Sequence, residues 1–385
     1  MPGFELIDMQ ELEEIREIFD NGGVLFRHSF DDLRHGIYKV RTFEQAFAQK
    51  VGAKYALAVT SGTAALRVAL ATLGIGAGDE VITQSFTFVA TVEAIIESRA
   101  RPVVTEIDET LNMDPADLAA KITHRTRAII PVHMLGVPAR MDEIKRVAEE
   151  RHIPVIEDTA WGCGGKYRGR SLGTLGALGT YSFDYAKAMT TGEGGMVVTS
   201  DTSLYQRAAA YHDHGHENNP AVPRWEDTRS GSGFNYRMSE LQGAVGLAQL
   251  RKLERVLAAQ RGHKKVLRDV ISTIPGISFR QIPDGSEEAA DALIFHVVDH
   301  VSARRVRDAL VTAGVGTKIL PEAIIWHFAG TWTHMPELVN SCGPDLSVAF
   351  PRSKDLLGRS VAIPVTVKMA SDLPEKIKKS VQSVL

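Results

Sequence analysis

Short apolar runs alternate with longer amphipathic stretches between residues 54 and 200. The runs at 55–59, 80–83, 127–132 and 154–157 have the length and composition of buried strands. After Gly62, leucines recur at 66, 70 and 73, so the segment between two runs has one apolar helical face. This alternation predicts a mostly parallel sheet covered by helices, with ligands bound beyond the carboxyl ends of its strands.

The pattern changes after residue 238. A long helical stretch covers residues 238–271 and is expected to connect two domains. Two further strands are predicted at 277–282 and 292–298, followed by a helix whose N-cap is expected to be Ser302. We therefore predict a large domain in residues 1–250 and a smaller α/β domain in residues 251–385.

One long stretch, from Tyr211 to Gly233, is polar and shows no periodicity. It predicts a loop, and loops of this length often shape binding sites.

Composition and charge narrow the class of protein. The 385 residues suffice for two or three domains, and the net charge of −3 gives no basic surface for nucleic acid or an anionic membrane. The first 15 residues do not resemble a signal peptide, and no apolar run reaches the length of a membrane span. Cys163 and Cys342 are too few for a disulfide framework. A cytoplasmic enzyme is predicted.

Lys187 is the first candidate for chemistry. It lies between the predicted strands 179–183 and 196–199, just before a glycine-rich turn at 192–195. If the fold encloses the amine, desolvation lowers its pKa and leaves free amine to form a Schiff base with a carbonyl. A surface lysine in a hairpin turn is the alternative, and other segments must decide between them.

Two segments at predicted strand ends supply possible partners. At Ser61-Gly62-Thr63 a strand breaks into a helix, so backbone N–H groups and hydroxyls can hold a phosphate, or merely cap the helix. Asp158 ends another strand, where its carboxylate can pair with a protonated pyridine nitrogen or cap the next segment.

Two more segments add an aromatic ring and an anion site. Phe88 follows the strand at 80–83 and can stack on a flat ring, although core packing is the commoner fate of a phenylalanine. Asn235 and Arg237 precede the long helix and offer groups that bind anions, unless they only begin a surface helix.

In this order, these segments resemble the DegT/DnrJ/EryC1/StrS family of pyridoxal-phosphate-dependent sugar aminotransferases, most closely over residues 53–255. The resemblance implies the aspartate aminotransferase-like fold type I. In that α/β fold a large domain contains a mostly parallel seven-stranded sheet flanked by helices, and a smaller C-terminal α/β domain follows it.

The resemblance also implies a site for pyridoxal 5'-phosphate. Lys187 and Asp158 would be catalytic, with Lys187 joined to the cofactor as a Schiff base and Asp158 facing its pyridine nitrogen. The implied cofactor-binding residues are Gly62, Thr63, Phe88, Asp158, Trp161, Ser182, Lys187 and Asn235. In such enzymes the residue matching Asn235 reaches the neighbouring subunit's phosphate, so a homodimer with shared sites is expected.

Trp161 departs from the family pattern. Most members carry Gln or His at this position, so the contact to the cofactor's phenolic oxygen is expected to be lost or altered.

The implied reaction is ping-pong transamination. L-Glutamate gives its amino group to the cofactor, leaving pyridoxamine phosphate and 2-oxoglutarate, and a keto sugar then takes it. The segments MPGFEL, 107–110 and 213–216 resemble the branch that acts on 8-oxo-3,8-dideoxy-octulosonate; a nucleotide-linked sugar is the other possibility. Either substrate is anionic, and the expected substrate-binding residues are Arg27, His214, His216 and Arg229, which are otherwise solvated loop residues.

Three alternatives stay open at this point. A protein of the same fold could decarboxylate or eliminate, a reading that Trp161 keeps open, or could bind cofactor or sugar without catalysis. His212, His214 and His216 could converge on zinc, but they lack a distant fourth ligand, so no metal is expected. Dehydratase members carry His in place of the lysine, and Lys187 argues against that branch.

Overall fold

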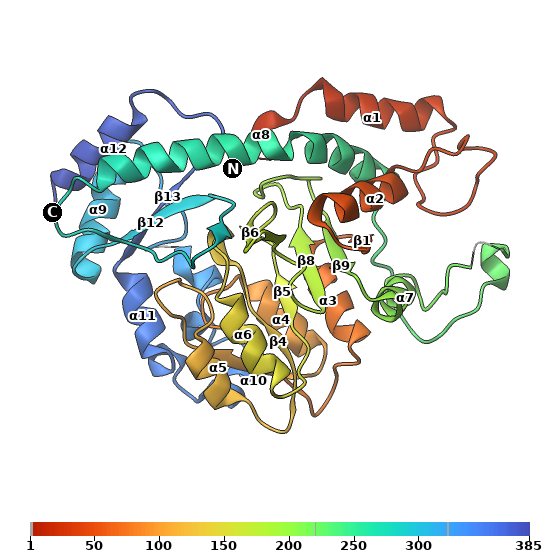
Figure 1. Ribbon diagram of the computed structural model, residues 1–385, viewed down its shortest axis with the longest axis horizontal. Helices are drawn as coiled ribbons and strands as arrows, with labels where there is room; N and C mark the ends of the chain where they lie inside the picture. The colour runs from red at the N-terminus through yellow and green to blue at the C-terminus, as the bar shows by residue number, and fades with distance from the viewer. Residues whose placement is uncertain (1–2, 220, 322) are drawn as a thin grey trace.

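The computed structural model describes residues 3–219, 221–321 and 323–385 (Figure 1). Its central sheet has the strand order β1-β9-β8-β5-β4-β2-β3. The strands are β1 (Tyr55–Val59), β2 (Glu80–Gln84), β3 (Arg101–Thr105), β4 (Thr126–Ile130), β5 (Ile156–Asp158), β8 (Leu178–Ser182) and β9 (Gly195–Thr199). Parallel bridges, such as the one between Val132 and Asp158, join β4 to β5. Only β9 among these seven runs antiparallel to its neighbours, so the predicted mostly parallel seven-stranded sheet is confirmed.

Helices cover both faces of this sheet, because successive strand residues point to opposite sides. Leu57 and Val59 of β1 pack in one core with α3 and α7, whereas Ala56 and Ala58 pack in another with α2 and α8. The helices around the sheet are α2 (Lys39–Val51), α3 (Gly62–Thr72), α4 (Val89–Glu97), α5 (Pro115–Lys121), α6 (Met141–Glu149), α7 (Thr202–Tyr211) and α8 (Glu240–Ile271).

The helix predicted after Gly62 is α3. The hydroxyl of Ser61 caps it by accepting from the Ala64 N–H at 3.0 Å. Leu66 and Leu70 are buried as predicted, and Leu73 is half-buried where the helix ends.

A second, antiparallel sheet lies in the C-terminal part of the chain. Its strands are β10 (Ser278–Phe279), β12 (Ala292–His296) and β13 (Ser360–Pro364), and they pack with α9 (His300–Thr312), α12 (Leu373–Gln382) and the end of α8. The expectation that Ser302 caps α9 is wrong. Asp299 is the N-cap, and its carboxylate accepts from the Ser302 N–H at 2.7 Å. The aspartate comes first in the chain and is the stronger acceptor.

Helix α8 runs unbroken along one side of the molecule, from α2 to α12, with α1 beside it (Figure 1). The domain boundary expected after residue 250 falls within this helix and stays a prediction. The remaining elements are α1 (Met9–Asp20), α10 (Pro336–Cys342), α11 (Pro351–Gly358), β6 (Lys166–Tyr167), β7 (Arg170–Ser171) and β11 (Ser286–Glu287), with 3-10 helices η1 (Phe4–Leu6), η2 (Met134–Gly136), η3 (Arg224–Glu226), η4 (Ala323–Trp326), η5 (Ala329–Thr331) and η6 (Leu346–Val348).

Two loops project from the same end of the molecule, residues 21–38 in red and residues 212–219 and 221–239 in green (Figure 1). The second corresponds to the loop predicted from Tyr211 to Gly233, but Tyr211 is the last residue of α7, η3 lies within the loop, and residue 220 lies outside the described residues. In the part of the chain that the structure describes, helices are all too short or too polar to cross a membrane.

Candidate active site

A cavity of about 490 Å³ opens beyond the carboxyl ends of β1, β5 and β8, where ligands bind in parallel α/β sheets. Seven of the eight expected cofactor-binding residues line it: Gly62, Thr63, Phe88, Asp158, Trp161, Ser182 and Lys187. The fold thus brings together groups that are spread over 126 positions of sequence, from 62 to 187. We call this space the lysine cavity.

Lys187 lies in the turn between β8 and β9, and its backbone accepts a hydrogen bond from the Gly3 N–H at 2.9 Å. Its Nζ is 3.4 Å from the centroid of the Trp161 ring. Burial lowers the pKa of the amine from 10.5 to about 8, with the charges of Asp184 and Asp291 opposing the shift. At pH 7 about a tenth of such an amine is unprotonated, against less than about one in a thousand for an ordinary lysine. The amine is therefore suited to attack a carbonyl.

Asp158 faces the same cavity from the end of β5. Its Oδ2 accepts from the Thr91 hydroxyl at 2.8 Å, and its Oδ1 accepts from the Ala160 N–H at 3.1 Å. Burial raises the pKa of the carboxyl group, while these two donors and the charge of Lys187 oppose the rise. A cationic ring nitrogen placed against Asp158 would stabilise the carboxylate form.

The start of α3 offers groups that could hold a phosphate. The N–H groups of a first helical turn have no intrahelical acceptor, and the helix dipole favours an anion there. A Cβ on Gly62 would lie 2.7 Å from the Cβ of Ser182, so only glycine lets the helix start approach the end of β8 this closely. The hydroxyls of Thr63 and Ser182 border the same space. This donor set fits a phosphate group.

Aromatic side chains also line the lysine cavity. Phe88 is 40% exposed and lines the cavity, so the alternative that it packs in the core is wrong. Its ring centroid lies 5.3 Å from that of His327, and Trp161 is 6.4 Å from the same imidazole. Such rings can stack on a flat heterocycle bound in the cavity.

Trp161 also contacts a second amine. The Nζ of Lys318 lies 4.8 Å from the indole centroid and forms an ion pair with Asp291 at 2.5 Å. An indole face stabilises a nearby cation. The Trp161 ring therefore lies close to two lysine amines, those of Lys187 and Lys318.

Sequence reasoning missed several residues of this site. Thr91 lies three residues after Phe88, one turn along α4, so helical spacing could have indicated it. His327 and Lys318 lie in irregular segments more than 130 residues after Lys187 in the sequence. No pattern in the sequence points to either residue.

Five predicted binding residues lie outside the lysine cavity. Asn235, His214 and Arg229 are exposed, and His216 bonds Asp227 through Nδ1 at 3.1 Å. Arg27 is buried and donates to Glu44 at 2.8 Å and to the Ala58 carbonyl at 3.0 Å, which is a structural position within one chain. Roles of these five in binding stay predictions.

The three histidines of the loop do not converge. His212 is buried with Nδ1 against the Ala209 carbonyl, whereas His214 is exposed and His216 is held by Asp227. Within residues 3–219, 221–321 and 323–385, no three His, Cys, Asp or Glu side chains are grouped to hold a metal ion.

Comparison with known proteins decides the family. Residues 29–382 match the DegT/DnrJ/EryC1/StrS aminotransferase family. The chain belongs to this family. The spore coat polysaccharide biosynthesis protein SpsC of Bacillus subtilis (strain 168) is 33% identical over 99% of this chain and 95% of its own length. GDP-perosamine synthase of Escherichia coli O157:H7 is 40% identical, but over 61% of this chain and 64% of its own length.

A solved structure agrees with this assignment. The aminotransferase from Psychrobacter cryohalolentis has a TM-score of 0.83 with 29% identity, covering 98% of this chain and 97% of that one. At the level of the DegT/DnrJ/EryC1/StrS family, the predicted fold type I, the enzyme class and the pyridoxal-phosphate cofactor are confirmed.

Proposed function

We propose that this protein moves an amino group from L-glutamate to a keto sugar by ping-pong transamination. The observation that carries the proposal is the lysine cavity itself. It places an amine of lowered pKa, a buried carboxylate and a phosphate cradle around one space bounded by aromatic rings.

Each group has a task that follows from its surroundings. The cofactor, when bound, supplies an electron sink that stabilises negative charge on the substrate carbon. Lys187 would hold the cofactor through its amine, and the amine, once displaced, would be placed to move a proton between the substrate carbon and the cofactor's C4′ as a general base and then a general acid. Asp158 would pair with the protonated ring nitrogen of the cofactor, and Phe88 and Trp161 would shield one side of the site from water.

The acceptor is proposed to be an anionic keto sugar. It is either linked to a nucleotide, as the name of GDP-perosamine synthase indicates for that relative, or a sugar acid similar to 8-oxo-3,8-dideoxy-octulosonate.

We also propose a homodimer in which Asn235 completes the neighbouring chain's phosphate site. Asn235 is exposed beside Phe234, and Trp225 in the same loop is 85% exposed. A large exposed aromatic surface of this kind is typical of an interface.

The test has two parts. Borohydride reduction of the purified protein followed by peptide mapping is expected to locate a pyridoxyl group on Lys187. Glutamate is then expected to remove the absorbance of the cofactor adduct and give 2-oxoglutarate, with sustained turnover on one of a panel of keto sugars. A pyridoxyl group elsewhere refutes the role of Lys187. Colour that no amino donor changes would support a binding protein, and release of carbon dioxide or of a leaving group would support decarboxylation or elimination.

A further inference from the structure

The segment formed by residues 3–11 lies against the turn that carries Lys187. We call residues 184–190 the lysine turn. The Gly3 N–H donates to the Lys187 carbonyl at 2.9 Å. A Cβ on Gly3 would lie 2.8 Å from that carbonyl oxygen and 3.0 Å from the backbone nitrogen of Thr190. Only glycine therefore lets the segment approach the lysine turn this closely.

The lysine turn has little regular structure of its own. Its residues lie outside the helices and strands, and the turn is closed where the Thr191 N–H donates to the Phe183 carbonyl at 2.9 Å. Inside it, the Lys187 N–H donates to the Asp184 carbonyl at 3.0 Å. Irregular backbone of this kind opens more easily than a sheet, so the position of its side chains depends on contacts with the surrounding structure.

A chain of buried polar groups fastens the far end of the lysine turn. The Thr190 N–H donates to Gln249 of α8 at 3.3 Å, and the amide of Gln249 donates to Glu11 of α1 at 2.8 Å. Gln249 and Glu11 are only 2% and 3% exposed, so water cannot easily replace either partner. Because an unpaired buried polar group is costly, this chain fixes Thr190 relative to α1 and α8.

Lys252 ties the same network to residues 3–11. Its amine donates to both carboxylate oxygens of Glu11 at 2.8 Å and to the Leu6 carbonyl at 2.7 Å, and it pairs with Asp8 at 2.9 Å. Burial raises the pKa of the Glu11 carboxyl group, but the bonds from Lys252, Asp8 and Gln249 outweigh burial and lower this pKa below 4.5. The carboxylate is therefore charged at neutral pH, which strengthens the bonds that it accepts.

We propose that residues 3–11 are a positioning element for Lys187, and that with Gln249 and Lys252 they hold the lysine turn so that the amine faces the lysine cavity. None of residues 3–11 is among those that line this cavity, so the segment acts through the backbone of the turn and not by touching a ligand. Small displacements of a reacting group lower reaction rates strongly. The consequence for amino transfer rests on the proposed function, whereas the positioning of the amine does not.

Two substitutions test the two attachments separately. Gly3→Ala places a methyl group against the backbone of the lysine turn, and Gln249→Met removes the acceptor of a turn N–H without adding a charge. Gly76→Ala is the control for the first, since a Cβ there meets nothing within 4 Å. Gln260→Met is the control for the second, because Gln260 is equally buried in α8 but donates to a carbonyl in the C-terminal part of the chain.

Hydrogen exchange of the cofactor-free, full-length protein is the first measurement. Gly3→Ala and Gln249→Met are each expected to speed exchange in residues 184–191 at least about tenfold, because each weakens a contact that holds the turn closed. Exchange in β2, a buried strand of the central sheet, should stay unchanged, and both controls should leave the turn unchanged. No acceleration in the turn with either variant, or equal acceleration in β2, overturns the proposal.

The titration of Lys187 is the second measurement. Trace acetylation of the cofactor-free protein over a range of pH gives the pKa of this amine from the yield of the acetylated Lys187 peptide. A loosened turn admits water to the amine, so its pKa should rise from about 8 toward 10.5 in both variants and stay near 8 in both controls. A purely structural role would lower stability without moving this pKa, so an unchanged pKa in both variants overturns the proposal.

The two proposals fail separately, because neither measurement needs the cofactor. Faster exchange in the turn and a raised pKa of Lys187, without any pyridoxyl group on Lys187 in the unchanged protein, refute only the proposed function. A pyridoxyl group on Lys187 with glutamate turnover, but no change of the turn in Gly3→Ala or Gln249→Met, refutes only the positioning role.

Discussion

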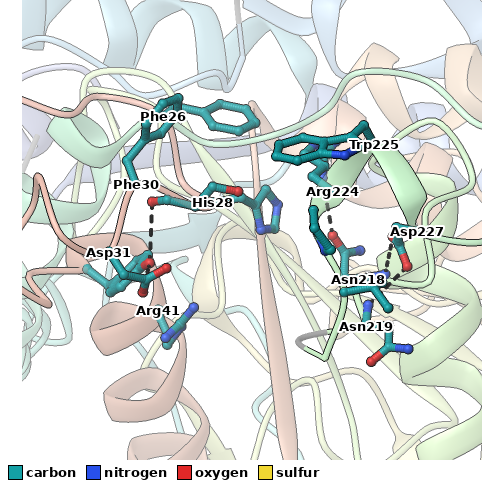
Figure 2. Close-up of a pocket in the computed structure, with 14 residues that line it drawn as sticks. Phe26, His28, Phe30, Asp31, Arg41, Asn218, Asn219, Arg224, Trp225 and Asp227 are labelled. Carbon is teal, nitrogen blue, oxygen red and sulfur yellow. Dashed lines mark hydrogen bonds between the residues drawn. The ribbon is translucent and has the colours of Figure 1, made fainter.

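The lysine cavity and a second cavity, which we call the loop pocket (Figure 2), are built in different ways. The first lies at the ends of β1, β5 and β8, where backbone hydrogen bonds of the sheet fix Asp158 and Ser182. The second lies between residues 26–41 and residues 222–227, and the relative position of these two walls depends on the ion pairs of Asp213. One cavity therefore takes its geometry from regular backbone, and the other takes it from a few side chains. The two cavities are therefore expected to respond to different substitutions.

The largest effect is expected from Lys187→Ala. It removes both the covalent attachment of the cofactor and the proton-transfer group, so formation of 2-oxoglutarate should fall at least about 1,000-fold. Lys145→Ala, at a half-buried position of α6 outside the lysine cavity, is the matched lysine control and should retain full rate. Retention of more than about a tenth of the rate by Lys187→Ala contradicts the assignment.

Asp213→Asn should weaken the ion pairs that hold the two loops together, and it should change the geometry of the lysine cavity only slightly. Removing one partner from a buried ionic cluster leaves cations uncompensated, and we expect the free energy of unfolding to fall by about 3 kcal/mol at pH 7. Asp355→Asn, which breaks an exposed pair with Arg359, should cost less than about 1 kcal/mol.

The stabilisation that Asp213 provides depends on pH, because its cationic partners hold the pKa of its carboxyl group well below 3.8. The stabilisation is complete above the unfolded pKa and declines as pH falls below about 4, because the unfolded state then takes up a proton first. Urea unfolding at pH 7 and pH 3 measures it. An equal effect of Asp213→Asn at both values would exclude the carboxylate as the source.

The sequence predicted the regular part of the molecule well. The strand ends that carry Asp158 and Ser182, and the turn at Gly62, follow from apolar runs and a strand-to-helix break, because such patterns are local. His327, which lines the lysine cavity, and Lys318, which lies against Trp161, could not be predicted, since tertiary packing of irregular segments brings them there. Their positions beside Phe88 and Trp161 depend on contacts between distant parts of the chain.

The positions of the cationic loop residues could not be predicted from the sequence either. Arg27, His214, His216 and Arg229 were selected because they are cationic and lie in polar segments. The structure instead turns Arg27 inward to Glu44, while Arg41 and Arg224 line the loop pocket. Positive φ angles and long-range ion pairs decide which side chains face a pocket, and neither is visible in composition.

Lys187→Met is expected to stabilise the cofactor-free protein at pH 7 by about 1–3 kcal/mol, because it removes an amine whose charged form is disfavoured by burial. The pKa is about 8 folded and 10.5 unfolded, so the folded state binds fewer protons between these values. The gain should be full below pH 8 and should decline toward pH 10.5. Thermal unfolding at pH 7 and pH 10 checks it; a gain that is the same at both would show that the amine is not desolvated.

The smallest effect is expected from Gly62→Ala. The new methyl group would displace Ser182 and disturb the phosphate cradle, so cofactor affinity should fall about tenfold. Gly76→Ala is the matched control, since a Cβ there meets nothing within 4 Å. Equilibrium dialysis with pyridoxal phosphate compares them, and equal affinities would show that the close approach at Gly62 does not serve the cofactor.

Trp161 lies beside the Lys187 amine, so its fluorescence can report on changes in the lysine cavity. The chain has four tryptophans; one borders the lysine cavity, and Trp225 borders the loop pocket. A charged amine 3.4 Å from an indole affects its emission, and a pyridine cofactor quenches it by energy transfer. The difference in emission between the unchanged protein and its Trp161→Phe or Trp225→Phe variant would therefore isolate the signal of that one tryptophan, since Trp326 and Trp332 are present in all three proteins.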